Sequence, residues 1–368
     1  MRPERRHTAR PAAALARALT AAALAASLLG LNEANAVPSA CAAAVAQDAV
    51  CETANRAVLQ AMQARGVEAV TVAQKVGTGS FVVIAASDPS RLDAATLVDP
   101  LSLAKVYLAA SWWERGLADA RFESTRGRED AENPAFRRFV NVHEVIVGGS
   151  DSAGRQMALA LRRAVGADAV VEDLKRFGFD RTRPFWGEFS PDLAQRLAPG
   201  RPAALERPLA EPEWAEALSL GEAEMTTSAL HVSRFFQAVG NRGHGCPPVA
   251  RIFGSDAARP PVRCAGQPVM AAATAGRLVS ALRDTVSRGT ARRVSGALSE
   301  SPWSLAGKTG TRTGEPVAQQ DGWFAGLILD ETGSPRFTIA TFVRRGGPGG
   351  GNAAEISAEV ARILAEAR

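Results

Sequence analysis

The C-terminal part of the chain most constrains the fold, because apolar runs follow one another there and are joined by turns. Three such runs cover 303–311, 322–329 and 337–344. Successive strands joined by turns pair antiparallel, so these runs predict a meander. A Gly-rich loop, 346–351, then leads to a helical pattern over 353–367. The chain is therefore predicted to end in an antiparallel sheet with one closing helix.

Helical patterns fill most of the chain before this sheet. Apolar residues recur at intervals of three and four in several segments, as they do along one face of a helix. One compact apolar run, 81–86, instead predicts a buried strand. Helices followed by an antiparallel sheet and one closing helix predict an α+β sandwich. The predicted helices cover 42–66, 153–165, 167–177, 228–240 and 271–286.

The first residues have the layout of a secretion signal, 1–36. Arginines precede an apolar run from Ala18 to Leu31, and Ala34-Asn35-Ala36 has small residues where a signal peptidase cleaves. We predict cleavage and export to the periplasm or cell envelope. An uncleaved membrane anchor is the alternative, and only that form would contact a membrane. The rest of the chain is expected to divide into an N-terminal helical segment, 37–76, and one large domain, 77–368.

The export segment also carries most of the excess positive charge. It holds five arginines and two glutamates, so the net charge falls from +5 for the whole chain to +2 without it. A net charge this small gives no basic surface for nucleic acid. We therefore predict no nucleic-acid partner.

Four cysteines lie beyond the signal, which is an even number in a chain predicted to be exported. Disulfides persist in oxidising compartments, so we predict two bridges between cysteines that are close in sequence, with free buried thiols as the alternative. The histidines form no group with metal-ligand spacing, and we predict no metal site. The predicted pairs are Cys41 with Cys51 and Cys246 with Cys264.

A serine and a lysine three residues apart form the first candidate catalytic pair. Asp99 as N-cap and Pro100 at the first helical position predict a helix start, so Ser102 lies in the first turn and Lys105 one turn further. Side chains at this spacing share a helix face, and the lysine could accept the proton of the hydroxyl. The alternative is a lysine whose stem merely packs along an apolar helix.

The scarcity of lysine makes the lysines that remain more informative. Only four of the 43 basic residues are lysine, and the others are arginine. A guanidinium does not give up its proton, whereas a buried ammonium can. Lys308 lies in Gly307-Lys308-Thr309-Gly310-Thr311, but a phosphate-binding loop would need Gly where the chain has Pro302. This second stretch therefore needs another interpretation.

A glycine-rich stretch before the helix 153–165 supplies a third candidate. Gly148 and Gly149 predict a tight loop that could direct the Ser150 hydroxyl into a cleft. The alternative is a plain helix cap, provided by Ser150 or Ser152.

These motifs together resemble those of the penicillin-recognising serine enzymes, which comprise the β-lactamases and the penicillin-binding proteins. Their order along the chain is that of the family, and two further segments resemble the transpeptidase domain of penicillin-binding proteins. The resemblance extends from about Gly77 to the C-terminus. The segments are Ser102-x-x-Lys105, Ser150-Asp151-Ser152, Leu218-Ser219-Leu220-Gly221, Lys308-Thr309-Gly310 and Asp321-Gly322-Trp323-Phe324-Ala325-Gly326.

The resemblance implies a fold and a partner. The fold would be an antiparallel sheet flanked by helices on both faces, with an all-helical subdomain, so that 77–368 forms a lone transpeptidase domain. The substrate would be a peptidoglycan stem peptide that ends in D-alanyl-D-alanine, and β-lactam antibiotics would be acylating inhibitors. No metal or organic cofactor would be needed.

The resemblance also implies roles for individual residues. Ser102 would attack the substrate carbonyl, and Lys105 would accept its proton. Ser150 would relay a proton to the departing nitrogen, and Lys308 would hold the substrate carboxylate. The hydroxyls of Thr309 and Thr311 would bind that carboxylate beside Gly310, and the backbone N–H groups of Ser102 and Thr311 would form the oxyanion hole.

Ser152 departs from the family pattern, in which the third residue of the middle motif is usually Asn. A serine is shorter and offers one hydroxyl in place of an amide, so substrate binding is expected to differ. Three functions stay open: a D,D-transpeptidase or D,D-carboxypeptidase, a serine β-lactamase, and a degenerate protein that binds cell wall or β-lactam without turnover. A β-lactamase needs a base for deacylation, but Glu188 lacks the sequence context of such a base, and a carbamate on Lys105 is the other source.

Overall fold

The computed structural model describes residues 49–125, 138–179, 211–222, 225–246, 268–312 and 314–366. All of them belong to one compact unit, 37–368. The predicted signal segment, Cys41, Cys264 and Glu188 lie outside the described residues. Among the residues that are described, no helix combines the length and the apolar character that a membrane span requires.

A five-stranded antiparallel sheet forms the centre of the fold, with strand order β2-β1-β7-β6-β5. The three C-terminal strands and the strand 81–86 confirm the sequence-based predictions. The remaining strand, which had not been predicted, joins the N-terminal region to the middle of the sheet by pairing with the last strand. The strands are β1 (Glu68–Gln74), β2 (Phe81–Ala86), β5 (Ser304–Thr311), β6 (Gly322–Leu329) and β7 (Pro335–Arg344).

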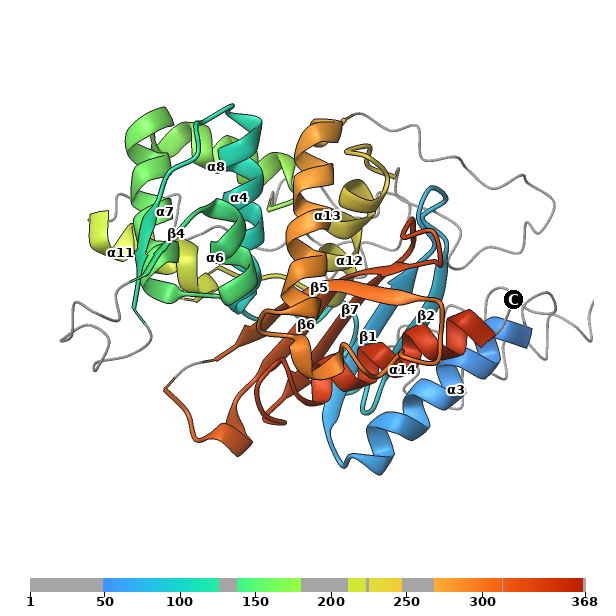
Figure 1. The fold of residues 1–368 in the computed structure, drawn as a ribbon. Helices are drawn as coiled ribbons and strands as arrows, with labels where there is room; N and C mark the ends of the chain where they lie inside the picture. Colours follow the sequence, from blue (N-terminus) through green and yellow to red (C-terminus); the bar gives the residue numbers. More distant parts are fainter. Residues whose placement is uncertain are drawn as a thin grey trace, which may run out of the picture. The chain divides into compact units, whose positions relative to one another are not determined.

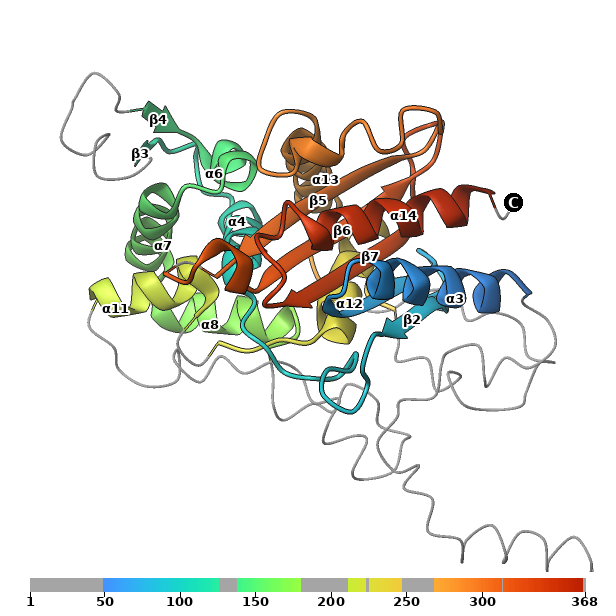
Figure 2. The same ribbon diagram turned by 90° about the horizontal axis from the view of Figure 1, so that it is seen from below.

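One face of the sheet is covered by the first and last described helices, α3 (Ala49–Ala64) and α14 (Asn352–Glu366), which lie side by side (Figures 1 and 2). Alternate sheet residues such as Phe324 and Ile339 form one core with the apolar stripes of these helices. The helices differ by about three hundred positions in sequence, so both ends of the described chain stabilise the same face. Residues 49–74, which the sequence-based division set apart from the large domain, thus contribute a helix and a strand to this fold.

The opposite face of the sheet packs against α12 (Ala229–Gly240) and α13 (Ala272–Ser287). Beyond them lies a helical region, which shares the larger hydrophobic core with this face (Figure 1). This arrangement confirms the predicted α+β class with helices on both faces and a helical subdomain. The helical region contains α4 (Ala104–Glu114), α6 (Val142–Gly148), α7 (Asp151–Val165), α8 (Ala167–Arg176), α11 (Glu211–Glu216) and the π-helix η3 (Ala217–Gly221).

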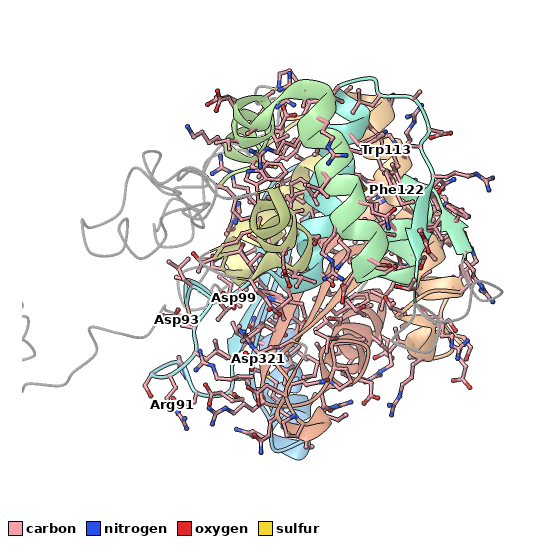
Figure 3. All side chains as sticks on the ribbon, turned by 90° about the vertical axis from the view of Figure 1, so that its left-hand side faces the viewer. Arg91, Asp93, Asp99, Trp113, Phe122 and Asp321 are labelled. Atoms are coloured by element: carbon pink, nitrogen blue, oxygen red, sulfur yellow. The ribbon has the colours of Figure 1, made fainter. Side chains whose placement is uncertain are left out.

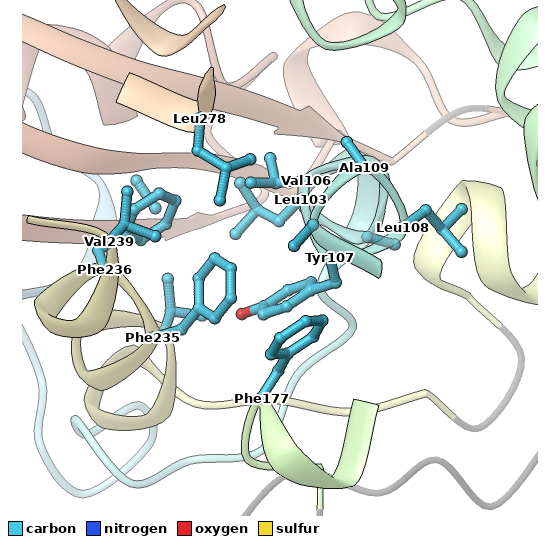
Figure 4. Close-up of a cluster of buried hydrophobic side chains, with 14 of the residues drawn as sticks. Leu103, Val106, Tyr107, Leu108, Ala109, Phe177, Phe235, Phe236, Val239 and Leu278 are labelled. Carbon is cyan, nitrogen blue, oxygen red and sulfur yellow. The ribbon is translucent and has the colours of Figure 1, made fainter. Parts of the chain in front are cut away.

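Helix α4 lies inside the larger hydrophobic core, and nearly all of its residues are buried. Its Tyr107 contacts the ring of Phe235 (Figure 4). The same tyrosine ring also contacts Phe179 edge-on. An apolar helix that is enclosed on all sides can hold the residues at its start rigidly. Lys105 lies in the first turn of α4, and Ser102 lies two residues before the helix begins.

Candidate active site

The nucleophile candidate follows a sharp turn and not a capped helix start. Asp99 was predicted as the N-cap, and this is wrong: the first turn is the 3₁₀-helix η1 (Leu101–Leu103), whose N-cap is Pro100. The Asp99 carboxylate instead accepts a hydrogen bond from Arg312 Nη2 at 2.9 Å. Arg312 also binds Asp321, and both aspartates are labelled in Figure 3. The start of this turn is thereby attached to the end of β5.

Leu101, immediately before Ser102, has φ 53°, which a bulky L residue rarely adopts. Such a conformation costs on the order of 1–3 kcal/mol and persists only where the surroundings enforce it. Gly221 of η3 packs directly on this residue, because a Cβ at position 221 would lie 2.3 Å from the Leu101 carbonyl oxygen. Gly310 of β5 contacts the same residue, since its Cβ would lie 3.1 Å from Leu101 Cβ. The turn before Ser102 is therefore packed between Gly221 and Gly310.

Ser102 and Lys105 meet as the spacing predicts. Lys105 Nζ donates a hydrogen bond to Ser102 Oγ at 2.8 Å. Ser102 lines a cleft, whereas the Lys105 side chain is 0 % exposed. A hydroxyl that faces the cleft is thus connected to an amine that solvent does not reach.

Burial lowers the pKa of Lys105 from its ordinary value of 10.5, and the charge of Asp151 opposes this effect. The space for the side chain depends on small neighbours. A Cβ on Gly154 would lie 2.8 Å from Lys105 Cε and 3.4 Å from Ser219 Cβ. α7 and η3 thus enclose the lysine without leaving room for another carbon.

Asp151 is the residue of the middle motif that reaches this pair. Its Oδ1 accepts a hydrogen bond from Lys105 Nζ at 2.8 Å. It is the first residue of α7, and it lines the cleft together with Gly149. Sequence reasoning noted Asp151 only as the centre of the motif and gave it no role.

The two serines of the motif have other partners. Ser150 is the N-cap of α7, and its hydroxyl accepts a hydrogen bond from Ala153 N at 3.3 Å. Ser152 Oγ accepts from Thr125 N at 2.9 Å and donates to Glu123 O at 3.2 Å, which attaches it to the strand β3 (Phe122–Ser124). The two hydroxyls lie 3.1 Å apart. The plain helix cap, which was the alternative interpretation, therefore describes the contacts of Ser150.

The contacts toward the other two motifs come from positions one residue earlier than Ser150 and Ser152 of the predicted motif. Gly149, in the left-handed conformation with φ 68°, lies where a side chain would contact Lys308, since its Cβ would be 3.2 Å from Lys308 Nζ. Asp151, two residues later, contacts Lys105. Gly149 and Asp151 thus make the contacts with Lys308 and Lys105, whereas the roles of Ser150 and Ser152 stay predictions.

The third motif lies on β5, the edge strand of the sheet. Arg312 N donates to Asp321 O, so the alternation of an antiparallel pair turns the Thr311 N–H away from β6. The Thr309 hydroxyl lies 2.6 Å from that of Thr290, and the Thr311 hydroxyl accepts from Gly349 N at 3.1 Å. Both threonines line the cleft, so the edge of the sheet offers backbone and hydroxyl donors side by side.

Lys308 is enclosed at the same edge and donates to its neighbour's backbone oxygen, Thr309 O, at 3.0 Å. Burial lowers its pKa to about 7, and the positive charge of Lys105 acts in the same direction. Lys308 therefore changes charge near neutral pH, which lysine at the surface does not do.

The cleft has a volume of about 830 Å³, and basic residues outnumber acidic residues in its lining. Arg288 on its wall is paired with Glu144 and Asp284, and Arg293 is paired with Glu355. The contacts of the described residues assign no acidic partner to Arg138 or Arg292. The lining consists of Ser102, Arg138, Glu144, Val147, Gly148, Gly149, Asp151, Arg288, Gly289, Thr290, Arg292, Arg293, Lys308, Thr309, Thr311, Pro348, Gly350 and Gly351.

A second carboxylate that sequence reasoning missed is Glu222, directly after η3. Burial raises its pKa, and the charges of Arg312 and Lys105 oppose this effect. No motif marks Glu222, which follows Gly221, the residue of η3 that packs on Leu101.

The cysteine and metal predictions are tested only in part by the described residues. Cys246 is disulfide-bonded, but its partner lies outside them, so both predicted pairings stay predictions. Within the described residues, no group of three histidine, cysteine or carboxylate side chains could hold a metal ion.

Comparison with known proteins identifies the family. Residues 69–365 match the family model of the penicillin binding protein transpeptidase domain. Because this match spans most of the chain, the protein belongs to that family. No curated protein sequence matches the chain.

Solved structures with the same fold include three penicillin-binding proteins. PBP2 of Pseudomonas aeruginosa, in complex with WCK 5153, has a TM-score of 0.64 at 19 % identity, over 86 % of this chain and 74 % of that chain. PBPA of Mycobacterium tuberculosis has a TM-score of 0.63 at 17 % identity, over 85 % and 80 %. PBP3 of M. tuberculosis, complexed with aztreonam, has a TM-score of 0.62 at 21 % identity, over 86 % and 77 %. These similarities establish the fold of the chain.

Proposed function

We propose that this protein is a D,D-transpeptidase or D,D-carboxypeptidase that forms an acyl-enzyme on Ser102. The single observation that carries the proposal is the contact of 2.8 Å between Ser102 Oγ and the Nζ of a fully buried lysine. A hydroxyl is a weak nucleophile at neutral pH, and an adjacent base activates it. The membership of the family supports a peptidoglycan stem peptide as the substrate.

The steps follow from the arrangement of the groups. The substrate carboxylate binds Lys308 and the hydroxyls of Thr309 and Thr311 at the edge of β5. Ser102 Oγ attacks the carbonyl carbon of the D-alanyl-D-alanine bond while its proton moves to Lys105. The N–H groups of Ser102 and Thr311 stabilise the oxyanion, and each such donor is worth on the order of 3 kcal/mol. As the C–N bond breaks, the proton on Lys105 moves to the departing nitrogen and the carbonyl re-forms. Loss of the terminal D-alanine leaves the acyl-enzyme, which an amine or water then resolves.

β-Lactams are proposed as acylating inhibitors of the same serine. Among the proteins of similar fold, PBP3 of M. tuberculosis was solved with aztreonam, and penicillin-binding protein A of that organism as a ceftriaxone acyl-enzyme complex. We also propose that residues 1–36 direct export, so that the domain acts in the periplasm or cell envelope, where its substrate is located.

A serine β-lactamase is the second candidate, and Glu222 is the observation that favours it. This half-buried carboxylate acts electrostatically on Lys105 and Asp151, and a carboxylate beside the acyl-enzyme could activate water for deacylation. A binding protein without turnover is the third outcome, because the middle loop presents Gly149 and not a hydroxyl toward Lys308.

Labelling with a fluorescent penicillin distinguishes these functions. The chain from Val37 to Arg368 is labelled and then chased with unlabelled drug, next to Ser102→Ala and Lys105→Arg. A band that depends on Ser102 and persists for many minutes supports the proposal. Rapid loss of the band with destruction of the drug indicates a β-lactamase, and no band in a folded protein indicates a binding protein. Lys105→Arg is expected to be nearly unlabelled, because arginine does not act as a base.

A further inference from the structure

Asp151 places a carboxylate against the amine that is proposed to activate the nucleophile. Lys105 Nζ donates to Ser102 Oγ and to Asp151 Oδ1, both at 2.8 Å. The Lys105 side chain is 0 % exposed, whereas that of Asp151 is 38 % exposed and lines the cleft. The ammonium form of Lys105 thus has a charged partner in the protein, and the neutral amine has only the hydrogen bonds.

We propose that Asp151 controls the proton on Lys105 and thereby sets the pH at which Ser102 is acylated. This inference rests on the proposed function, in which Ser102 is the nucleophile and Lys105 its base. An amine that carries its full set of protons cannot accept the proton of the hydroxyl. The carboxylate stabilises that inactive form, so acylation is slow until Lys105 loses its proton. Asp151 acts through Lys105 and is therefore a positioning residue.

The reaction step requires one proton to move, and its balance is complete without Asp151. The extra proton of the Lys105 ammonium first leaves to solvent through the Ser102 hydroxyl, which is bonded to Lys105 Nζ and lines the cleft. The Ser102 hydroxyl then gives its proton to Lys105 Nζ as Oγ forms a bond to the carbonyl carbon, and the carbonyl electron pair moves to oxygen. When the C–N bond breaks, the proton on Lys105 moves to the departing nitrogen. Lys105 is neutral again, and Asp151 keeps its charge throughout.

Asp151 is one of several charges that act on Lys105, and their signs differ. Burial lowers the pKa of Lys105, Asp151 raises it by charge and by hydrogen bond, Arg155 on α7 lowers it, and Glu222 after η3 raises it. On β5, the charges of Lys308 and Lys105 repel each other.

The other elements that pack on α4 bring charges that already have partners. His143 and Glu144 of α6 pair with Asp284 and Arg288 of α13, and Asp173 of α8 pairs with Arg115 beyond the far end of α4. Asp151 is thus the acidic group among these that bonds Lys105 directly.

Asp151→Asn tests the inference, because the amide oxygen can accept the same hydrogen bond without the charge. The rate constant for acylation by a fluorescent penicillin is measured from pH 5 to 10. In the wild type the rate rises as Lys105 loses its proton. In Asp151→Asn we expect this rise at a lower pH by about one unit, which makes acylation up to about tenfold faster at neutral pH with a similar maximum.

Arg155→Gln is the matched control, because it removes a positive charge from the same helix. Since Arg155 lowers the pKa of Lys105, this variant is expected to move the rise in the opposite direction, to higher pH. Opposite shifts for the two variants indicate electrostatic control of Lys105, which a general disturbance of α7 would not produce. An unshifted or uniformly slower profile for Asp151→Asn overturns the inference.

A direct titration keeps the inference testable if a variant does not fold. The chain has only four lysines, so ¹³C labelling at lysine Cε gives few signals, and Lys105→Arg identifies the one from Lys105. Its midpoint should fall in Asp151→Asn and rise in Arg155→Gln, and an unchanged midpoint in either folded variant contradicts the inference. Failure of the proposed function looks different: the wild type is then unlabelled at every pH, or Ser102→Ala is labelled normally.

Discussion

Gly154 contacts Lys105 so closely that a Cβ at this position would lie 2.8 Å from Lys105 Cε. The lysine cannot easily withdraw, because its side chain is buried and its amine is bonded to both Ser102 and Asp151. The absence of a side chain at position 154 of α7 therefore determines where the proposed base can lie.

Gly154→Ala is expected to slow acylation by at least about tenfold with a small effect on stability. Overpacking costs about 1–3 kcal/mol, and the greater helix propensity of alanine offsets about 1 kcal/mol of it. Displacement of the amine by a few tenths of an ångström is sufficient to weaken proton transfer from Ser102. Penicillin labelling rates and urea unfolding of the same samples measure the two effects.

The control is Gly276→Ala in α13, where an added Cβ would meet no atom within 4 Å. That variant should be labelled at the wild-type rate and should be more stable by up to about 1 kcal/mol. Wild-type labelling of Gly154→Ala would show that the lysine tolerates the added carbon.

The lowered pKa of Lys308 predicts that ligand binding weakens as the pH rises through neutrality. Burial lowers its pKa to about 7, so the ammonium that attracts a carboxylate is present below pH 7 and is lost above it. The dissociation constant for the initial complex with a penicillin should therefore increase between pH 6 and 8. The methyl ester of the same penicillin lacks the carboxylate and serves as the control, with a nearly constant dissociation constant. Parallel pH dependence of the acid and the ester would assign the effect to another group.

Local pattern was sufficient for the strands β5, β6 and β7 and for helices such as α12 and α13, because their periodicity is long and clear. It was not sufficient for β1, where seven residues give an ambiguous pattern. That strand is defined by pairing with β7, for example Thr71 with Thr341 across most of the chain length. Asp99 was assigned wrongly for the same reason, since its partner Arg312 lies 213 residues away.

The candidate site was predictable in its motifs but not in its contacts. The Ser102–Lys105 spacing fixes a shared helix face, so this contact follows from the sequence. The middle motif depends on where α6 ends and α7 begins, and a shift of one residue changes which side chains face the cleft. Capping turns the Ser150 hydroxyl toward its own helix, and Asp151 comes to lie against Lys105. Glu222 has no motif at all, so only packing could find it.

Tyr107 predicts a substitution that stabilises the protein. Its hydroxyl is buried in the aromatic cluster of Figure 4, and the described residues give it no hydrogen-bond partner. Burial also raises its pKa, so the hydroxyl stays neutral. An unpaired buried hydroxyl costs about 1–3 kcal/mol, and Tyr107→Phe should recover about 1 kcal/mol of that cost in urea unfolding. A loss of stability would indicate that the hydroxyl has a partner, such as a buried water molecule.

Arg292 predicts that the capture of anionic ligands depends on salt. It lines the cleft together with Arg138 and Lys308, and its side chain is exposed, so its charge acts through solvent. Arg292→Gln is expected to lower the second-order rate constant for acylation by a penicillin about two- to fivefold at low ionic strength. The difference should nearly vanish at about 0.5 M salt, where exposed charges are screened within a few ångströms.

Arg56→Gln is the control for Arg292→Gln, because Arg56 lies on α3 and pairs with Glu52 outside the cleft. It should have the wild-type rate at every salt concentration. An Arg292→Gln defect that persists at high salt would mean that Arg292 touches the ligand directly, and no defect at low salt would remove it from ligand capture altogether. The salt dependence thus distinguishes long-range electrostatic attraction by Arg292 from direct contact between Arg292 and the ligand.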